Sequence, residues 1–155
     1  MSEIRNDDEF RSAIDGLDQV AQRVLAARFL ESILPLSNDE RITGVMQVAA
    51  RTDASEAELE NALHLARAVA MDTYTRCGAE CDWREQAGYF VARTAIATVT
   101  PAGQMAGGPA WQAAMSSRMA RTCKSIELEE DTAGQERQEQ YRILSAFIDT
   151  QRDVL

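Results

Sequence analysis

The chain has 155 residues, three cysteines and one histidine, and its 25 acidic residues outnumber 16 basic ones to give a net charge of −9. This length suits a single domain over residues 1–155, and a content of 45% hydrophobic and 26% charged residues excludes a disordered chain. The excess of acid disfavours nucleic acid and anionic membranes as partners, and one histidine excludes a histidine-rich metal site.

The first residues and the cysteines predict a cytoplasmic protein. Residues 1–10 are polar and charged, unlike a signal peptide, and no run of about 18 apolar residues predicts a membrane-spanning helix. Cys77, Cys81 and Cys123 are an odd number of thiols, which favours free cysteines in a reducing compartment. We therefore expect no membrane partner.

Apolar residues recur at helical spacing along nearly the whole chain. The first long stripe runs from Leu17 to Ile33, and Pro35 ends it because proline lacks the amide donor. The same periodicity continues to the end of the sequence. It predicts seven helices, at 8–15, 17–34, 38–51, 56–76, 83–100, 109–131 and 134–153.

Capping signals support these helix starts. A serine or aspartate followed three residues later by glutamate can satisfy two free amides at the start of a helix. The chain has Ser37 with Glu40, Ser55 with Glu58 and, in weaker form, Asp82 with Glu85. Strand signals are almost absent, and the short loops favour antiparallel neighbours. The expected fold class is all-α, a single-domain bundle of about six to seven mostly antiparallel helices.

The longest irregular stretch is the glycine-rich loop 101–109, which reads PAGQMAGGP. It follows no strand and precedes no Gly-Lys-Ser/Thr, so it does not have the pattern of a phosphate-binding loop. A plain connector between two helices is the simplest interpretation, and a hinge or binding loop is the alternative.

Charge is distributed unevenly along the sequence. The segment 86–126 contains no aspartate or glutamate and carries +4, whereas the remainder carries −13. Acidic residues cluster at 7–18, 53–60, 80–85 and 127–139. One interpretation is a solvated outer face around two more buried helices, because carboxylates are rarely buried unpaired. The other is an acidic docking surface for a basic partner.

No catalytic or metal-binding motif stands out. Cys77 and Cys81 lack the second cysteine pair or the histidines that complete a structural zinc site. A di-iron bundle needs two Glu-x-x-His motifs, and this chain has a single histidine. His64, with Glu60 one turn before it, fits a surface histidine. Catalysis by His64 with a cysteine is the alternative. We expect no catalytic residue, no metal and no cofactor.

The order of segments resembles that of the small all-helical immunity proteins of bacterial polymorphic-toxin systems. The resemblance runs from Leu17 to about Glu130 and rests on FLESILPLSNDERI, SEAELENALHLARAVAM, GYFVARTAIATVTPAG and AWQAAMSSRMARTCKSIELEED. The start of the second helix in these proteins is matched by Asp39, Glu40 and Arg41. A helical family of unknown function is also similar, with a final helix like QYRILSAFID.

The resemblance implies a non-catalytic protein that binds and inhibits a cognate protein toxin. Two tryptophans near helix starts could anchor such an interface, although core packing is the simpler role for them. The candidate partner-binding residues are Glu80, Asp82, Trp83, Trp111, Glu127, Glu129, Glu130 and Asp131. The alternatives are a helical homo-oligomer, such as a homodimer, and the enzyme that uses His64 with a cysteine.

Overall fold

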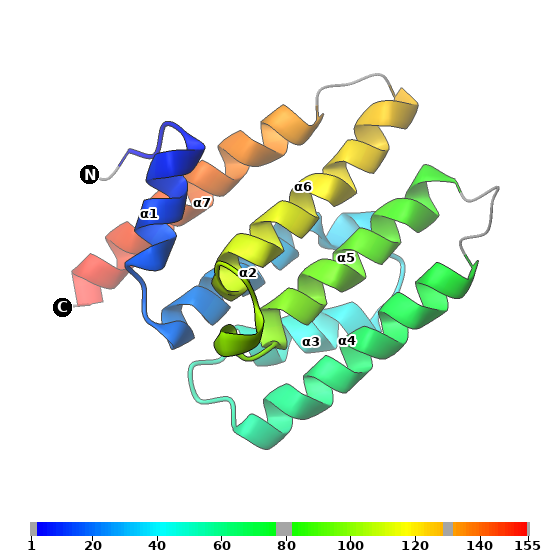
Figure 1. The fold of residues 1–155 in the computed structure, drawn as a ribbon, viewed down its shortest axis with the longest axis horizontal. Coiled ribbons are helices and arrows are strands. Elements are labelled where there is room, and N and C mark those ends of the chain that lie inside the picture. The colour runs from blue at the N-terminus through cyan, green and yellow to red at the C-terminus, as the bar shows by residue number, and fades with distance from the viewer. Residues whose placement is uncertain (1–2, 77–81, 129–131, 155) are drawn as a thin grey trace.

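The computed structural model describes residues 3–76, 82–128 and 132–154, with side chains at 3–76, 82–123 and 134–151. These ranges contain seven α-helices, two 3₁₀ turns and no strand (Figure 1). The helices are α1 Asp7–Asp15, α2 Gln19–Ile33, α3 Arg41–Ala49, α4 Glu56–Arg76, α5 Trp83–Val99, α6 Gly108–Leu128 and α7 Thr132–Val154. The expected all-α bundle is confirmed. None of the described helices is long and apolar enough to cross a membrane.

The capping predictions hold for α4 and α5 and fail for α3. In α4, Ser55 and Glu58 form the reciprocal capping box, each side chain accepting the other's backbone amide at 3.1 Å. In α5, the Asp82 side chain accepts from the Glu85 amide at 3.0 Å. The Ser37–Glu40 box is wrong, and α3 starts three residues later than predicted. The Ser37 hydroxyl instead accepts from the Asp39 amide at 3.1 Å, after the 3₁₀ turn Leu34–Leu36.

Helix α5 is the centre of the bundle. It lies between α4 and α6 on one face, while α2 and α3 pack behind it and α1 and α7 lie on the far side of α6 (Figure 1). Small residues make this possible, because α5 buries four alanines and also Gly88, where a Cβ would lie 3.8 Å from Thr73 Cγ2 of α4. Because other helices pack closely against α5 on several sides, few charged residues can be accommodated in it.

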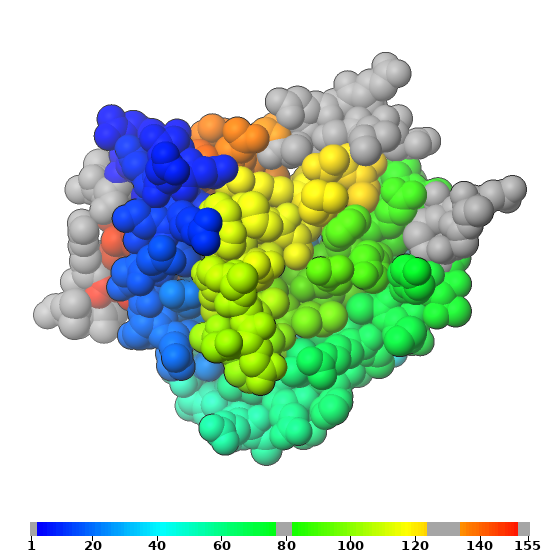
Figure 2. All heavy atoms as spheres, in the orientation of Figure 1, coloured from blue at the N-terminus to red at the C-terminus, as the bar shows by residue number. Residues whose placement is uncertain are grey.

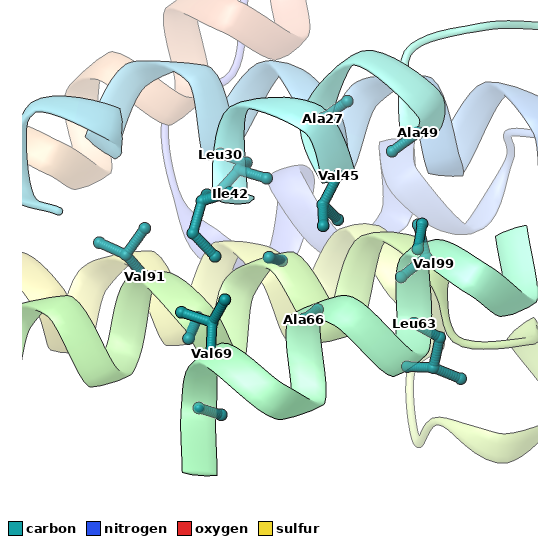
Figure 3. Close-up of a cluster of buried hydrophobic side chains, with 14 of the residues drawn as sticks. Ala27, Leu30, Ile42, Val45, Ala49, Leu63, Ala66, Val69, Val91 and Val99 are labelled. Atoms are coloured by element: carbon teal, nitrogen blue, oxygen red, sulfur yellow. The ribbon is translucent and has the colours of Figure 1, made fainter. Parts of the chain in front are cut away.

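Two groups of buried apolar side chains hold the helices together. The first lies among α2, α3, α4 and α5 and includes Leu30, Ile42 and Val69 (Figure 3). The second lies among α1, α2, α6 and α7, where Phe10 stacks near Phe29 and Tyr141 with ring centroids 5.9 and 5.4 Å apart. Each fully buried large side chain contributes roughly 2 kcal/mol through the hydrophobic effect.

The glycine-rich loop turns tightly into α6. Gly107 and Gly108 have φ values of +80° and +86°, which side chains other than glycine rarely adopt. A Cβ on Gly107 would lie 2.7 Å from the Trp111 ring, and a Cβ on Gly108 would lie 2.5 Å from Gln22 Oε1. These two glycines let the loop close onto α2 and α6.

Candidate protein-binding surfaces

Most of the predicted acidic residues lie outside the described part of the chain. The structure does not describe Glu80, Glu129, Glu130 and Asp131. For Glu127 it describes the backbone, which belongs to α6, but not the side chain. The predicted acidic docking surface therefore stays a prediction for these positions.

Asp82 and Trp83 lie at the start of α5. Asp82 is exposed and caps the helix, and Trp83 is half-buried with the Arg84 guanidinium 5.4 Å from its ring. The C-terminal end of α6 lies at the same end of the bundle (Figure 1). Asp82 and Trp83 thus lie at the same end of the bundle as the α6 backbone at Glu127, and their role in an interface stays a prediction.

Trp111 lies elsewhere, near the start of α6. Its ring is 6.2 Å from Phe10 and has the Arg11 guanidinium 4.7 Å above it, so it packs where α1 covers α6. Seventeen residues of helix, about 25 Å, separate it from the end of α6. Trp111 is therefore not part of a single surface with Asp82 and Trp83.

An open groove lies between α2 and α7. It has a volume of about 900 Å³ and an apolar floor that includes Ile143, Ala146 and Phe147 of α7. Its rims carry two exposed ion pairs, Arg28 with Glu31 on α2 at 3.6 Å and Arg142 with Glu139 on α7. We call this surface the α2–α7 groove. Sequence analysis did not find it, because it needs the packing of helices more than 100 residues apart.

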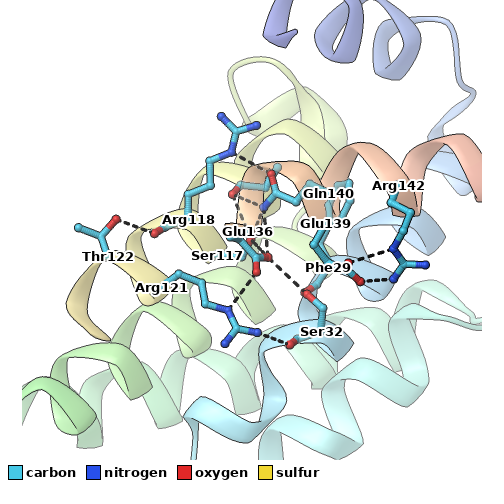
Figure 4. Close-up of polar contacts among 11 residues, drawn as sticks. Phe29, Ser32, Ser117, Arg118, Arg121, Thr122, Glu136, Glu139, Gln140 and Arg142 are labelled. Atoms are coloured by element: carbon cyan, nitrogen blue, oxygen red, sulfur yellow. Dashed lines mark hydrogen bonds and ion pairs between the residues drawn. The ribbon is translucent and has the colours of Figure 1, made fainter. Parts of the chain in front are cut away.

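The buried carboxylate of Glu136 lies beside the α2–α7 groove and connects α7, through Arg121, to α6 and α2. Glu136 of α7 is only 2% exposed, and its Oε2 accepts from Arg121 Nε of α6 at 3.0 Å (Figure 4). Arg121 also donates to the Ser32 carbonyl of α2 at 2.9 Å. Burial raises the pKa of Glu136, against the lowering effect of Arg121. One ion pair thus joins α2, α6 and α7.

A second polar chain extends from this carboxylate to α1. The Gln140 amide nitrogen donates to the Ala114 carbonyl at 2.9 Å, and its oxygen accepts from Arg118 at 2.9 Å. Arg118 also donates to both oxygens of Asp7, at 3.0 and 2.8 Å, and Tyr141 donates to Asp7 at 2.7 Å. The Arg118 hydrogen bond holds the pKa of Asp7 below its usual value. These contacts fix the position of α7.

Another exposed surface follows the seam between α4 and α5. Met71 and Tyr74 of α4 are 66% and 67% exposed, more than the other exposed large apolar side chains among the described residues. The Tyr74 ring lies 5.9 Å from the Tyr89 ring of α5, and Arg93 lies over Tyr89 at 5.9 Å. Figure 2 shows α4, α5 and α6 open to solvent on one face. Tyr89 itself is half-buried and packs against the buried apolar group among α2, α3, α4 and α5.

His64 lies away from the buried cysteine. Its side chain is 68% exposed, 3.9 Å from Glu60, and lines a pocket of about 640 Å³ beside the turn Pro101–Gln104. The Cys123 thiol is buried in α6, and burial raises its pKa. That direction is opposite to the one a nucleophilic cysteine requires. Cys77 and Cys81 lie outside the described residues.

Within the described side chains, no three histidine, cysteine, aspartate or glutamate residues come together as a metal site would require. Comparison with protein families, curated proteins and solved structures finds no match to this chain.

Proposed function

We propose that this chain is a non-catalytic protein-binding module, a cytoplasmic immunity protein that inhibits a cognate bacterial toxin by occupying it. The observation that carries the proposal is the α2–α7 groove, an apolar floor between two charged rims. The resemblance to helical immunity proteins supplies the class of partner.

The shape of the groove supports docking of a protein segment. Its lining on α7 runs from Glu139 to Gln151, about 18 Å of helix, which matches three turns of an incoming amphipathic helix. Phe147 is half-buried and offers an aromatic anchor at the floor. Binding there would bury apolar surface that the isolated chain leaves in water.

The rims support specificity. The pair Arg28–Glu31 has both side chains more than half exposed, so it contributes at most about 1 kcal/mol to folding. Arg28 and Glu31 can therefore break this pair and form ion pairs with a partner protein at little cost in folding stability. The net charge of −9 favours rapid encounter with a basic toxin, which agrees with the acidic clusters of the sequence.

Growth protection tests the proposal. Cells that express the toxin encoded beside this gene should survive with the wild-type chain and die with Ala146→Arg, which places a long charged side chain at the exposed edge of the groove floor. The matched control is Ala68→Arg, an exposed alanine on α4, and it should protect fully.

Two results would count against the proposal. If the wild-type chain neither binds the neighbouring toxin nor protects cells, the immunity role is wrong. If Ala146→Arg protects as well as Ala68→Arg, the toxin does not use the α2–α7 groove.

A further inference from the structure

The seam between α4 and α5 carries a row of side chains that are exposed, except for the half-buried Tyr89. On α5, Glu85, Tyr89 and Arg93 follow one another at four-residue spacing, so they lie on one ridge of the helix. On α4, Arg67, Met71 and Tyr74 lie on one side of the helix, and the Tyr74–Tyr89 ring contact joins the two rows. We call these six residues the α4–α5 stripe.

The charges of the stripe have no partners of opposite sign among the described side chains. Arg67, Arg93 and Glu85 are all exposed, and no ion pair joins any of them to another described residue. By contrast, Arg41 and Arg51 on the same bundle each contact two carboxylates. Arg93 donates to the Tyr89 hydroxyl at 3.2 Å, which leaves its charge without a carboxylate among the described side chains. Arginines of this kind beside exposed methionine and tyrosine are the composition of a protein interface.

The order of these charges is self-complementary. Along α5 the stripe runs from acid at Glu85, through the aromatic Tyr89, to base at Arg93. Glu85 and Arg93 each lie four residues, about 6 Å of helix, from Tyr89. A two-fold axis through Tyr89 would therefore set Glu85 of one copy opposite Arg93 of the other, and the reverse.

We propose that the α4–α5 stripe is the interface of a symmetric homodimer, in which two copies of α5 cross antiparallel at Tyr89. Met71 and Tyr74 lose their exposure to water in this contact, and two Glu85–Arg93 pairs flank it. An isologous contact of this kind closes after two copies, so it gives a dimer and not a filament.

The size of the stripe predicts a weak dimer. It extends over about 12 Å along each of two helices whose axes lie about 9 Å apart, so the contact buries roughly 700 Å² in total. That area is below the usual size of a stable interface, so we expect a transient dimer with a dissociation constant of about 100 µM. The α2–α7 groove lies on the opposite side of the bundle from α4, so it stays open in the dimer (Figure 1).

Charge-swap variants of the full chain test the proposal by sedimentation velocity at about 1–300 µM, a range that brackets the expected dissociation constant. The wild-type chain should dimerise as its concentration rises. Arg93→Glu places this glutamate opposite Glu85 of the other copy, and Glu85→Arg places this arginine opposite Arg93 of the other copy. Because like charges then face each other, each variant should weaken association at least about tenfold. A mixture of the two variants should form a one-to-one heterodimer, because each position then faces an opposite charge.

Matched controls and contrary outcomes make the test decisive. Arg28→Glu changes the same charge on α2, outside the stripe, and should dimerise like the wild type. Circular dichroism of each variant should show an unchanged helical spectrum. A monomer at every concentration would overturn the proposal. So would a dimer that Arg93→Glu leaves intact, or two folded variants that fail to pair with each other.

Discussion

Arg121→Met tests whether Arg121 holds Glu136 as a buried carboxylate. Arg121 donates to Glu136 Oε2 at 3.0 Å and to the Ser32 carbonyl at 2.9 Å. Methionine keeps most of the aliphatic stem, so the change removes the charge and its hydrogen bonds more than the packing. Breaking a buried pair by removing one partner costs about 3–5 kcal/mol.

The expected cost lies near the lower limit of that range. The other oxygen of Glu136 still accepts from Ser117 and Ser32, at 3.3 and 3.4 Å, and these long hydrogen bonds compensate only in part. We therefore expect Arg121→Met to lower the free energy of unfolding by about 3 kcal/mol at pH 7. Adding Glu136→Gln removes the buried charge, so the double variant should recover most of the loss.

The cost should also depend on pH. Burial raises the pKa of Glu136 above its ordinary value of 4.5, so the folded state holds this proton to higher pH than the unfolded state. Protonated Glu136 therefore adds to the free energy of unfolding. This contribution is fully present below about pH 4.5 and is lost as the pH rises through the folded-state pKa of Glu136. Losing Arg121 raises that pKa further, so Arg121→Met should cost less at pH 5 than at pH 7.

Urea unfolding at both pH values, followed by circular dichroism, measures these differences. Arg142→Met is the control, because Arg142 pairs with Glu139 on the exposed side of α7, and it should change stability by less than about 0.5 kcal/mol. An Arg121→Met cost below about 1 kcal/mol, equal at both pH values, would refute the account of Glu136 as a buried charged partner.

Three further predictions concern glycines, Asp7 and Cys123. Gly44→Ala should raise the free energy of unfolding by about 0.5–1 kcal/mol in urea titrations, because nothing lies near the Cβ position of Gly44 in α3. Gly108→Ala should lower the free energy of unfolding by about 1–3 kcal/mol, because Gly108 has a positive φ. Asp7→Asn should destabilise the fold at pH 7. Thermal melts should show the difference from wild type shrink as the pH falls below about 3.8 and vanish only once the pH is below the lowered folded-state pKa of Asp7. The Cys123 thiol should react with a thiol reagent more slowly in the folded chain than in urea.

Local signals were sufficient for the helices. The period of apolar residues and the caps at Ser55 and Asp82 predicted six helix starts within two residues of those observed. The predicted start of α3 was wrong because the Ser37–Glu40 capping box does not form. Ser37 and Asp39 are both residue types favoured at helix starts, but α3 begins after Glu40, whose side chain makes no cap, and Asp39 accepts from the Arg41 amide at 3.0 Å.

The surfaces could not be predicted from local signals. The α2–α7 groove and the Glu136–Arg121 pair join residues far apart in the sequence, so only the packed helices define them. A weak signal for the pair was present, because Arg121 lies in the acid-free segment and needs a carboxylate from elsewhere. For the α4–α5 stripe, helical spacing shows which residues share a face but not whether another helix covers that face.

Isothermal titration of the purified chain with the toxin encoded beside its gene tests the central claim most directly. The account predicts a one-to-one complex per chain with a dissociation constant of about 10 nM or tighter, retained by Ala68→Arg and weakened at least about 100-fold by Ala146→Arg. A folded Ala146→Arg variant that binds as tightly as the wild type would contradict the assignment of the α2–α7 groove, and a wild-type chain that does not bind would contradict the proposed function itself.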